Sequence, residues 1–381
     1  MNIGNKSALV FAAMLPLMVL EAAQPPAGVN GPPQPRREVD NSRAPVLQFR
    51  TEEFGKLPAD RNFGEILGVA VNSTGKVVIL NHPGSAHDGP LFGNATTELL
   101  EFDSQGNLLR EIGNMVYGLG YAHQVRFDKY DNLWVVDKGT DQVIKFSPEG
   151  KVLMNLGRRA EGYDSEPGEH MNPAEAVPVD GWFRAPTDVT WDPDDNIFVS
   201  DGYVNSRIAK LTKEGDWITS WGRNGRGGVN ANENPGAISN PHSMQADRNG
   251  NVYVGDRGNR RIQVFDKDGN FQRFMFLNAP YDKRHHPTLG NLPADPQTRP
   301  DQTAPWTMCM TNTATQYLFV MDSEPGRLYK MTLDGRIVGM LGMSGRPMGR
   351  FNWPHGIACP SENLVYIADM NNWRVQKITI N

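Results

Sequence analysis

Short apolar, β-branched runs alternate with turns rich in Asp, Asn and Gly along most of the chain. In the stretch "FDKYDNLWVVDKGTDQVIKFSPEGK", for example, the runs "LWVVD" and "QVIKF" are each bounded by polar turn residues. Runs this short and this regularly punctuated are typical of β-strands, and Gly and Pro recur between them as turn residues. The pattern predicts an all-β fold with many turns.

One unit of this pattern recurs six times. It contains an apolar strand, a turn, a β-branched strand ending in Asp, a loop, a strand often carrying Arg-Ile or Arg-Val, a second turn and a last strand. The first copy, from "ILGVAVNSTG", is looser, and the sixth stops after "VQKITIN", one strand short. Four short strands per unit at a period of about 40 residues predict a six-bladed β-propeller.

The ends of the chain complete this organisation. We expect "PVLQFR" at 45–50 to supply the missing strand of the sixth blade, so that the propeller occupies residues 45–381. Residues 1–23 resemble a signal peptide, with Lys6 before an apolar run and a cleavage site near Ala23; a retained anchor is the alternative. The Pro-rich segment 24–44 is a flexible leader. We therefore expect a secreted or periplasmic protein with no other membrane segment.

Acidic and basic residues recur in register with the strands and have a structural interpretation. We expect each Asp to accept turn hydrogen bonds or to pair with the Arg that follows it in the same or a neighbouring blade. The recurrent residues are Asp137, Asp201, Asp256, Asp322 and Asp369, with Arg207, Arg261, Arg327 and Arg374.

Composition narrows the function classes. The net charge of −5 and the lack of a Lys/Arg block argue against nucleic-acid binding.

The two cysteines, Cys309 and Cys359, fall near the same place in consecutive repeats and could pair, but we expect two buried free thiols. Segments 158–183, 223–239 and 278–304 exceed the repeat and are expected to form long loops on the faces.

Histidine occupies one repeat position in alternate units only. The position just before the first strand holds Leu67, His123, Thr187, His242, Trp306 and His355 in repeats one to six. First strands line the channel of a propeller, and alternate blades lie about 120° apart. The three imidazoles should therefore point inward from the corners of a triangle.

A triangle of imidazoles predicts a metal site with an open fourth position. Catalytic zinc is bound in this way, and three neutral ligands leave the full charge of the ion to acidify a hydroxyl or polarise a carbonyl. Nickel, copper, iron or cobalt could also accept imidazoles. The alternative is that each histidine only packs or forms hydrogen bonds at a blade rim.

These residues resemble a known family. "PTDVTWDPDDNIFVSDGYVNSRI", "NPHSMQADRNGNVYVGDRGNRRIQVF" and "WPHGIACPSENLVYIAD" resemble NHL-repeat propellers, and among them peptidyl-α-hydroxyglycine α-amidating lyase, over about residues 60–380. The resemblance implies a zinc ion on His123, His242 and His355. It further implies Tyr203 as the base and Arg257 as a residue lining the site. The family reaction cleaves a carbinolamide into an amide and glyoxylate.

Two positions depart from the family. Its catalytic arginine after the second strand of the first blade is His82 here, which could supply a cation or a proton but not the forked contact of Arg with a carboxylate. Its calcium-binding aspartate after the last histidine ligand is Gly356 here, which argues against calcium in the channel. The resemblance therefore supports the metal-binding histidines of this chain more strongly than it supports the family's particular reaction.

Three hypotheses follow. The first is an exported, zinc-dependent propeller enzyme acting on a small-molecule or peptide substrate, with His82, Tyr203 and Arg257 as its catalytic residues. The second is a non-catalytic propeller that binds a protein or carbohydrate, with Trp182 and Tyr163 as possible anchors. The third, a lactone hydrolase, ranks last because those enzymes place carboxylates around calcium in the channel, where this chain has histidines.

Overall fold

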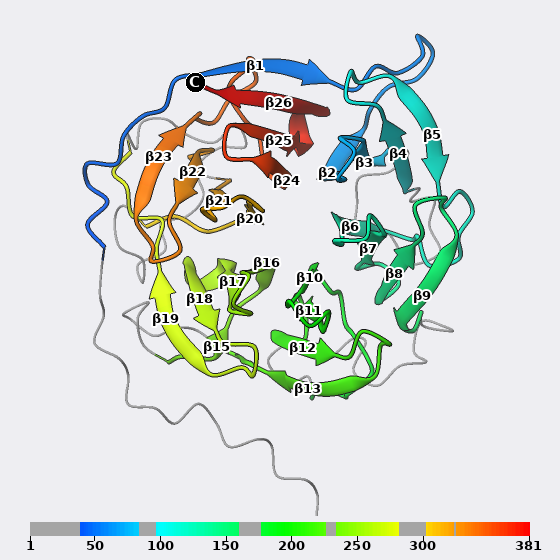
Figure 1. Ribbon diagram of the computed structural model, residues 1–381, viewed down its shortest axis with the longest axis vertical. Helices are drawn as coiled ribbons and strands as arrows, with labels where there is room; N and C mark the ends of the chain where they lie inside the picture. The colour runs from blue at the N-terminus through cyan, green and yellow to red at the C-terminus, as the bar shows by residue number, and fades with distance from the viewer. Residues whose placement is uncertain (1–38, 84–96, 160–176, 226–233, 282–301, 324) are drawn as a thin grey trace, which may run out of the picture.

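The computed structural model describes residues 39–83, 97–159, 177–225, 234–281, 302–323 and 325–381. Six four-stranded antiparallel sheets are arranged as blades around a central axis (Figure 1). The first strand of each blade lies nearest to the axis, and the fourth lies at the rim. The all-β six-bladed propeller that the repeats predict is therefore confirmed.

The strands follow the repeats in chain order. Blade 1 comprises β2 (Glu65–Val71), β3 (Val77–His82), β4 (Glu98–Phe102) and β5 (Leu108–Ile112). Blade 2 comprises β6 (Ala122–Phe127), β7 (Leu133–Asp137), β8 (Gln142–Phe146) and β9 (Val152–Gly157). Blade 3 comprises β10 (Asp188–Trp191), β11 (Ile197–Asp201), β12 (Arg207–Leu211) and β13 (Trp217–Trp221).

The second half repeats the plan after a short parallel pair, β14 (Arg223–Asn224) and β15 (Ala237–Ile238). Blade 4 comprises β16 (Pro241–Ala246), β17 (Val252–Asp256), β18 (Arg261–Phe265) and β19 (Phe271–Met275). Blade 5 comprises β20 (Thr307–Met310), β21 (Leu318–Met321), β22 (Leu328–Met331) and β23 (Ile337–Leu341). Blade 6 contains β24 (Pro354–Ser361), β25 (Leu364–Asp369) and β26 (Arg374–Ile380). The 3₁₀ turns η1 (Arg257–Asn259) and η2 (Met370–Asn372) follow β17 and β25.

The ring is closed by the N-terminal strand β1 (Phe49–Phe54), which pairs antiparallel with β26 as the outer strand of blade 6. The sequence prediction placed this strand at 45–50, four residues too early. Residues 45–47 instead run beside β23, where Leu47 donates to the Met340 carbonyl at 2.8 Å. Leu47 covers Gly339, at which any side chain would collide with it. The sequence alternates suitably in both windows, so pairing with β26 decides the register.

Burial along each blade explains the composition of its strands. The second strands, such as β7, β11 and β17, are buried throughout, and they read as near-continuous β-branched and aromatic runs. Outer strands such as β9 are half exposed and carry mixed residues. The core lies between neighbouring blades, where Trp134 and Trp191 from blades 2 and 3 meet at a ring-centroid distance of 5.3 Å. Stacking of the blades buries faces that one blade alone would expose.

The recurrent Asp residues have the structural role that the repeats predict. In blades 3, 4 and 6 each accepts from the Arg side chain that follows it: Asp201 from Arg207 (2.9 Å), Asp256 from Arg261 (2.8 Å) and Asp369 from Arg374 (2.9 Å). In blade 5 the Arg327 backbone N–H donates to Asp322 at 2.8 Å, and the guanidinium donates to the Ala279 carbonyl at 2.9 Å. Blade 2 has no Arg at this point, and burial raises the pKa of Asp137 to about 6.

Cys309 in β20 and Cys359 in β24 form a disulfide with their Cα atoms 6.0 Å apart. The expectation of two free thiols is therefore wrong. The two inner strands lie side by side in neighbouring blades, and both side chains face the same buried cluster. Equivalent repeat positions in adjacent blades are close in space, which brings the two sulfur atoms together.

Several sequence predictions fall on parts of the chain outside the described residues. The signal peptide at 1–23 and most of the leader at 24–44 are among them, as are parts of the three long loops. Within the described ranges, no helix has the length and apolar character needed to cross a membrane.

Candidate metal centre

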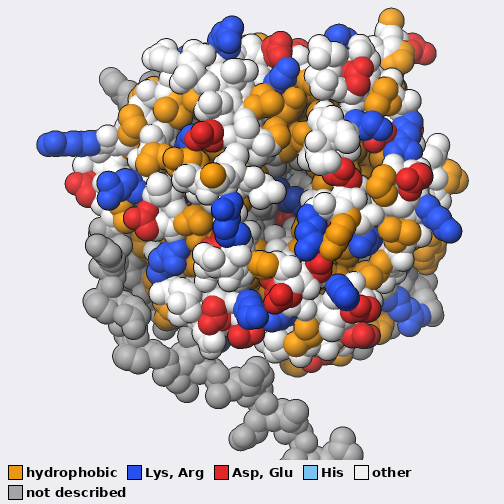
Figure 2. Space-filling view, viewed as in Figure 1, with side chains coloured by type: hydrophobic (Ala, Val, Ile, Leu, Met, Phe, Trp, Pro, Cys, Tyr) orange, Lys and Arg blue, Asp and Glu red, His pale blue; other side chains and the backbone are white. Residues whose placement is uncertain are grey.

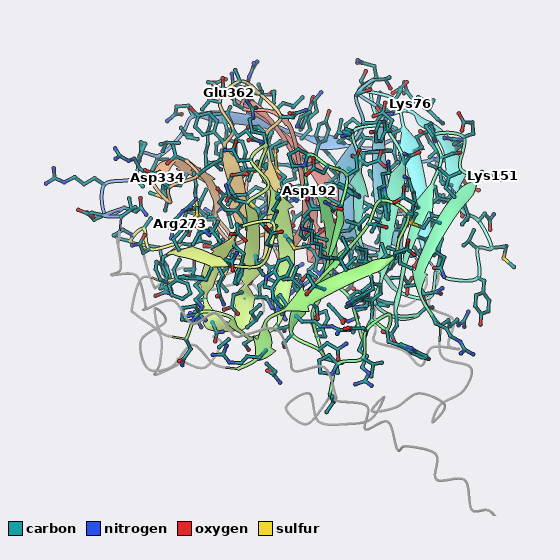
Figure 3. The ribbon with its side chains drawn as sticks, turned by 60° about the horizontal axis from the view of Figure 1, so that its bottom comes forward. Lys76, Lys151, Asp192, Arg273, Asp334 and Glu362 are labelled. Atoms are coloured by element: carbon teal, nitrogen blue, oxygen red, sulfur yellow. A yellow bond between two sulfur atoms is a disulfide. The ribbon has the colours of Figure 1, made fainter. Side chains whose placement is uncertain are left out.

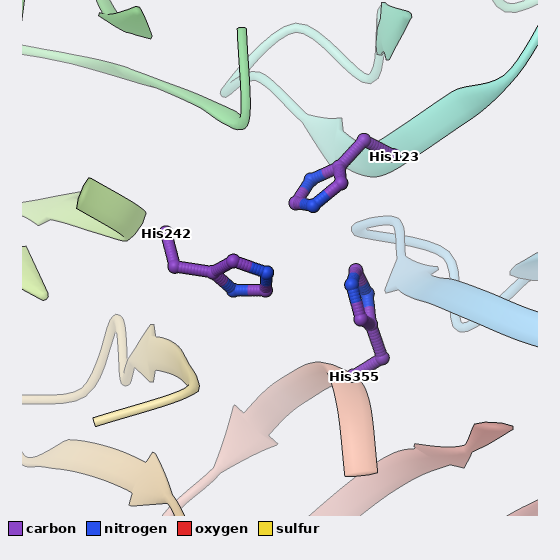
Figure 4. Close-up of side chains that lie close together, drawn as sticks. All are labelled: His123, His242 and His355. Atoms are coloured by element: carbon purple, nitrogen blue, oxygen red, sulfur yellow. The ribbon is translucent and has the colours of Figure 1, made fainter. Parts of the chain in front are cut away.

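Three buried histidines converge on the propeller axis (Figure 4). His123, His242 and His355 lie in the inner strands β6, β16 and β24. In each strand the pairing register shifts across the histidine, so that this residue has no partner in the second strand. A β-bulge of this kind re-aims the extra side chain. The bulges therefore place the three imidazoles inside the ring of blades.

The three odd-numbered blades hold these imidazoles in position. Each Nδ1 lies within hydrogen-bond distance of a backbone carbonyl of the next blade, and each acceptor occupies the repeat position that the histidine itself occupies in its own blade. The pairs are His123 with Thr187 (2.8 Å), His242 with Trp306 (2.7 Å) and His355 with Leu67 (2.9 Å). A carbonyl can only accept, so Nδ1 carries the proton and Nε2 remains a base. At this repeat position, the even-numbered blades thus supply the imidazoles, and the odd-numbered blades supply the backbone carbonyls that hold them.

The triad meets the requirements of a metal site. One ligand nitrogen from each histidine lies within 4.8 Å of the other two. Burial lowers the pKa of His123 and His242 well below the usual value, and it lowers that of His355 to about 3. Neutral imidazoles are the form that binds a metal, and a carbonyl on the second nitrogen is the usual outer support. The donor set therefore fits zinc or another imidazole-binding ion.

Tyr203 places its hydroxyl beside the triad. The oxygen lies 3.2 Å from His123 Nε2 and 3.1 Å from His242 Nε2. Tyr203 follows β11 after Gly202, where a Cβ would approach the Pro241 carbonyl oxygen to 2.4 Å. Glycine is therefore required at 202 for the turn to pack against blade 4. That close packing carries the phenol to the axis.

Arg257 follows β17 and lies against two aromatic rings of the site. Its guanidinium carbon is 4.2 Å from the Trp306 ring centroid and 5.5 Å from that of Tyr203. Both distances are within the range of cation–π attraction. Burial lowers the pKa of Arg257, and the contact with Tyr203 opposes this. Arg257 forms no ion pair with any residue that the structure describes, so its charge is available to a ligand.

Lys138 is a further site residue, which sequence reasoning missed. Its Nζ lies 4.6 Å from the Tyr203 ring centroid and 4.9 Å from that of Tyr121. Its charge lowers the pKa of His123 and His355, after the larger effect of burial. The signal was present in the repeats, because Asp137-Lys138 in blade 2 aligns with Asp256-Arg257 in blade 4.

His82 occupies the same position in blade 1, but it is neutral. Its side chain is 3% exposed and packs edge-on against Tyr121, with ring centroids 4.3 Å apart. Neither ring nitrogen has a hydrogen-bond partner within the described ranges. Burial lowers the pKa of His82 to about 4, the backbone of Ala122 offsets part of this, and Lys138 lowers it further. At neutral pH, His82 therefore carries no charge to the site.

Arg126 supplies a fixed cation to the axis, three residues beyond His123 in β6. Its guanidinium makes a two-pronged ion pair with Asp188 of β10, at 3.0 Å from Nε and 2.7 Å from Nη2. It also donates to the carbonyls of Met308 in β20, at 2.9 Å, and Ile357 in β24, at 3.2 Å. One buried side chain thus connects blades 2, 3, 5 and 6 across the channel.

Gly356 is in contact with blade 1 and leaves no room for a side chain. A Cβ there would lie 2.6 Å from Gly68 Cα and 2.7 Å from the Leu67 carbonyl oxygen. The aspartate that the resemblance implies at this position would therefore not fit this backbone. This chain thus has no aspartate at position 356, and it has the Arg126 guanidinium on the axis.

Comparison with known proteins agrees with this fold. The family model described as "NHL repeat" matches residues 239–265, which span β16 to β18. Structural similarity extends to a streptogramin B lyase, with a TM-score of 0.52 and 14% sequence identity over 87% of this chain and 98% of that one. At this identity the likeness bears on the fold alone.

Sequence similarity extends to amidating enzymes. Peptidyl-glycine α-amidating monooxygenase of Mus musculus is 28% identical over 343 residues, which cover 83% of this chain and 30% of the mouse protein. A probable peptidyl-α-hydroxyglycine α-amidating lyase of Caenorhabditis elegans is 30% identical over 246 residues, covering 61% of this chain and 64% of its own length. This chain therefore spans less than a third of the mouse protein and under two thirds of the nematode one.

The fold defines the class of protein: the chain is a six-bladed β-propeller, and one stretch of it, residues 239–265, matches the NHL repeat. Within that class it is similar in sequence to the mouse peptidyl-glycine α-amidating monooxygenase and to the nematode peptidyl-α-hydroxyglycine α-amidating lyase.

Proposed function

We propose that this chain is an exported, zinc-dependent lyase that cleaves the C–N bond of a carbinolamide and releases an amide and glyoxylate. The observation that carries the proposal is the triad, in which three neutral imidazoles direct Nε2 to one point beside the Tyr203 hydroxyl. Sequence similarity to an amidating monooxygenase over 83% of this chain, and to a probable amidating lyase over 61% of it, supports the reaction type. The Cys309–Cys359 disulfide supports an oxidising compartment outside the cytosol.

The residues of the site can perform each proton transfer of this reaction. A zinc ion held by the triad would supply a Lewis acid for the oxygen atoms of the substrate. Tyr203, as its phenolate, would accept the proton of the substrate hydroxyl. The O–H electron pair would become the new carbonyl bond as the C–N bond breaks, and the amide nitrogen would take the proton from Tyr203. The phenolate is then restored.

Arg257 has the position of a residue that stabilises charge on this phenolate. Its guanidinium lies against both Tyr203 and Trp306, and both Arg257 and Tyr203 are partly buried. Electrostatic stabilisation is strongest where the surroundings have a low dielectric constant. His82, which is neutral and buried, would shape the cavity wall next to Tyr121 and would not bind an anion.

Metal content and turnover test this proposal together. We expect about one zinc per chain by plasma mass spectrometry, loss of the metal in His242→Ala, and retention of it in Tyr203→Phe. The Tyr203→Phe variant should release no glyoxylate from a carbinolamide, because it lacks the hydroxyl that transfers the proton. Turnover by this variant would show that Tyr203 is not the base. Absence of any bound transition metal after reconstitution would remove the proposed catalytic centre.

Absence of a bound transition metal would instead favour a non-catalytic binding propeller. Of the two aromatic residues considered as its anchors, Trp182 is half-buried and lies 5.9 Å from the Arg158 guanidinium. Tyr163 lies outside the described residues. A protein without metal would be screened for ligands of the loop at 158–183.

A further inference from the structure

Two positions of the repeat have a left-handed backbone in several blades, and blade 6 places a tryptophan at both. The first position lies two residues before the triad position and is followed by proline in blades 3, 4 and 6. It holds Ala185 in blade 3 and Asn240 in blade 4, with φ angles of 50° and 56°. In blade 6 it holds Trp353, with a φ of 61°.

The second position lies directly before the third strand. In blades 2, 3, 4 and 6 its φ is between 52° and 58°, and it holds Asp141, Ser206, Arg260 and Trp373. A positive φ brings Cβ close to a carbonyl oxygen, and for a bulky residue it is an outlier of the kind found at functional sites. Because the other blades form the same turns with other residues, the fold itself does not require tryptophan at either position.

Both tryptophans lie at the face where the inner strands begin. β24 and β26 each pair antiparallel with β25, so they run in the same direction, and Trp353 and Trp373 precede their starts. The Asn371 N–H donates to the Asn352 carbonyl at 3.1 Å and holds the two segments together. Trp373 is 59% exposed, whereas Trp353 is partly buried. The histidines of the triad lie at this same end of their strands.

Trp306 of blade 5 connects Trp353 to the metal centre. The Trp306 carbonyl supports His242, and the centroid of the indole lies 5.3 Å from that of the imidazole. Trp353 packs edge-on against the same indole, with centroids 4.8 Å apart. Trp306 is 9% exposed, and its Nε1 has no hydrogen-bond partner among the described residues. A buried N–H without an acceptor is costly, so a ligand carbonyl bound to it would be stabilising.

We propose that Trp306, Trp353 and Trp373 form an aromatic track over blades 5 and 6 that binds the acyl part of the substrate and selects aromatic or large apolar acyl groups. The inference rests on the proposed function, since it places the carbinolamide at the triad. The track is continuous with that site at His242 and ends in solvent at Trp373. Tryptophan offers a large, rigid apolar surface at little cost in side-chain entropy, and its N–H can donate to a peptide carbonyl.

The other blades offer no comparable path from the triad to the surface. At the position of Trp353 they hold Glu65, Tyr121, Ala185, Asn240 and Ala304. The aromatic residue among these, Tyr121, packs against the buried His82, with centroids 4.3 Å apart. In blade 6, by contrast, the segment of Trp353 is bonded to the segment of the exposed Trp373. The acyl part of a substrate can therefore follow aromatic rings outward over blade 6.

Binding of ligands that cannot react tests the inference without turnover. N-Benzoylglycine and N-acetylglycine share a carboxylate, lack the hydroxyl of a carbinolamide and differ only in the acyl group. We expect calorimetric titration to show about tenfold or more tighter binding of the benzoyl ligand by the unmodified protein. Trp353→Asn should remove most of this ratio and leave binding of the acetyl ligand unchanged. Asn240 shows that asparagine fits this backbone, and Trp353→Phe should retain most of the ratio.

A longer ligand tests the outer end of the track. Trp373→Asn should weaken binding of N-benzoylphenylalanylglycine about threefold or more and leave binding of N-benzoylglycine unchanged, because only the longer ligand reaches Trp373. Tyr130→Asn is the matched control and should leave binding of both ligands unchanged. Tyr130 is also 59% exposed, but it lies in the turn between β6 and β7. Turns of this kind form the opposite face, which Figure 2 shows. Figure 3 labels residues from three of them, Lys76, Asp192 and Glu362.

The possible results separate this inference from the proposed function. Equal binding of the benzoyl and acetyl ligands by the unmodified protein, or binding of neither, would overturn the inference. So would a ratio in Trp353→Asn within about twofold of the unmodified one, or an equal loss for both ligands, which a purely structural role of Trp353 would give. Unchanged binding of the longer ligand by Trp373→Asn would equally contradict the track. Aromatic-selective binding by a protein that cleaves no carbinolamide would refute the proposed reaction and leave the aromatic site standing. In an active protein, Trp353→Asn should raise KM for an N-benzoyl carbinolamide, with kcat and zinc content unchanged.

Discussion

The ion pair between Arg126 and Asp188 should contribute strongly to the stability of the ring. The two side chains are 10% and 0% exposed, and they meet through two hydrogen bonds of 3.0 and 2.7 Å. Arg126→Met would keep much of the side-chain volume and remove the charge. Breaking a buried pair by removing one partner costs about 3–5 kcal/mol, because the other charge is left without compensation.

Neighbouring groups adjust this magnitude in both directions. Asp188 would keep three donors, namely the Ser243 hydroxyl and the backbone N–H groups of Met244 and Val189, all within 2.9 Å. The carbonyls of Met308 and Ile357 would lose their donor, which adds to the cost by about 1–3 kcal/mol for a buried group left unsatisfied. We therefore expect a loss of about 4 kcal/mol for Arg126→Met.

Urea denaturation, followed by tryptophan fluorescence, measures this loss through the shift of the transition midpoint. Arg110→Met is the control, because Arg110 also pairs with a glutamate, Glu101 at 2.7 Å, but is about a third exposed. Glu101 is only 6% exposed, but it would keep Lys76 at 3.8 Å as a second cation, so we expect a smaller loss of about 1 kcal/mol. The double variant Arg126→Met, Asp188→Asn should lose less than the sum of the single variants, because it leaves no charge unpaired.

A cost below about 1 kcal/mol for Arg126→Met would refute the reasoning, because it would mean that the pair behaves as a surface contact. Calcium provides a second readout. Without the guanidinium, one carboxylate and two carbonyls face the axis, and oxygen ligands of this kind suit Ca²⁺. We expect added calcium to recover part of the stability of Arg126→Met and none of that of Arg110→Met.

Three further predictions concern stability and pH. The metal-free protein should lose stability as pH falls from about 6.5 towards 3. The cause is that the pKa of His355 is about 3 in the folded state, so the unfolded chain takes up the proton first. A urea midpoint that does not change over this pH range would contradict the prediction. The paired variant Cys309→Ser, Cys359→Ser should lower stability by about 4 kcal/mol, as the chain-entropy estimate gives for a loop closed across 50 residues, and an unchanged urea midpoint would contradict it. Gly356→Asp should fail to fold or melt well below the unmodified protein in calorimetry, and a stable variant that gains a calcium ion would show that the ring adapts.

Most of the fold was predictable because the sequence of each repeat contains the strand and turn pattern of one whole blade. The strand and turn signals recur in every unit and the Asp in all but the first, so an error in one unit is corrected by the others. The closing strand is the exception, since residues 45–50 and 49–54 alternate equally well and only contact with β26 selects between them. The disulfide was missed for a related reason. The repeat positions of Cys309 and Cys359 showed that the residues are near one another, but not that their side chains face each other.

The candidate site was predictable only in part. His123, His242 and His355 share one repeat position, and the structure brings them together with Tyr203 and Arg257. Lys138 could have been found by aligning the residue after each second strand, as was done for the histidines. Arg126 could not, because it occurs in one blade and its partners lie between 62 and 231 residues away along the chain.

The sequence by itself determined the propeller and the histidine triangle, because in a closed ring of equal blades a repeat number is also an angle about the axis. Residues at one repeat position in alternate units must then converge, whatever their surroundings. Only the tertiary structure decided the charges at that point: which carbonyl supports each imidazole, that His82 is buried and neutral, and that Lys138 and Arg126 reach the axis. These features depend on long side chains and backbone groups from several blades meeting at distances of a few ångströms, and no local pattern in one repeat encodes such a meeting.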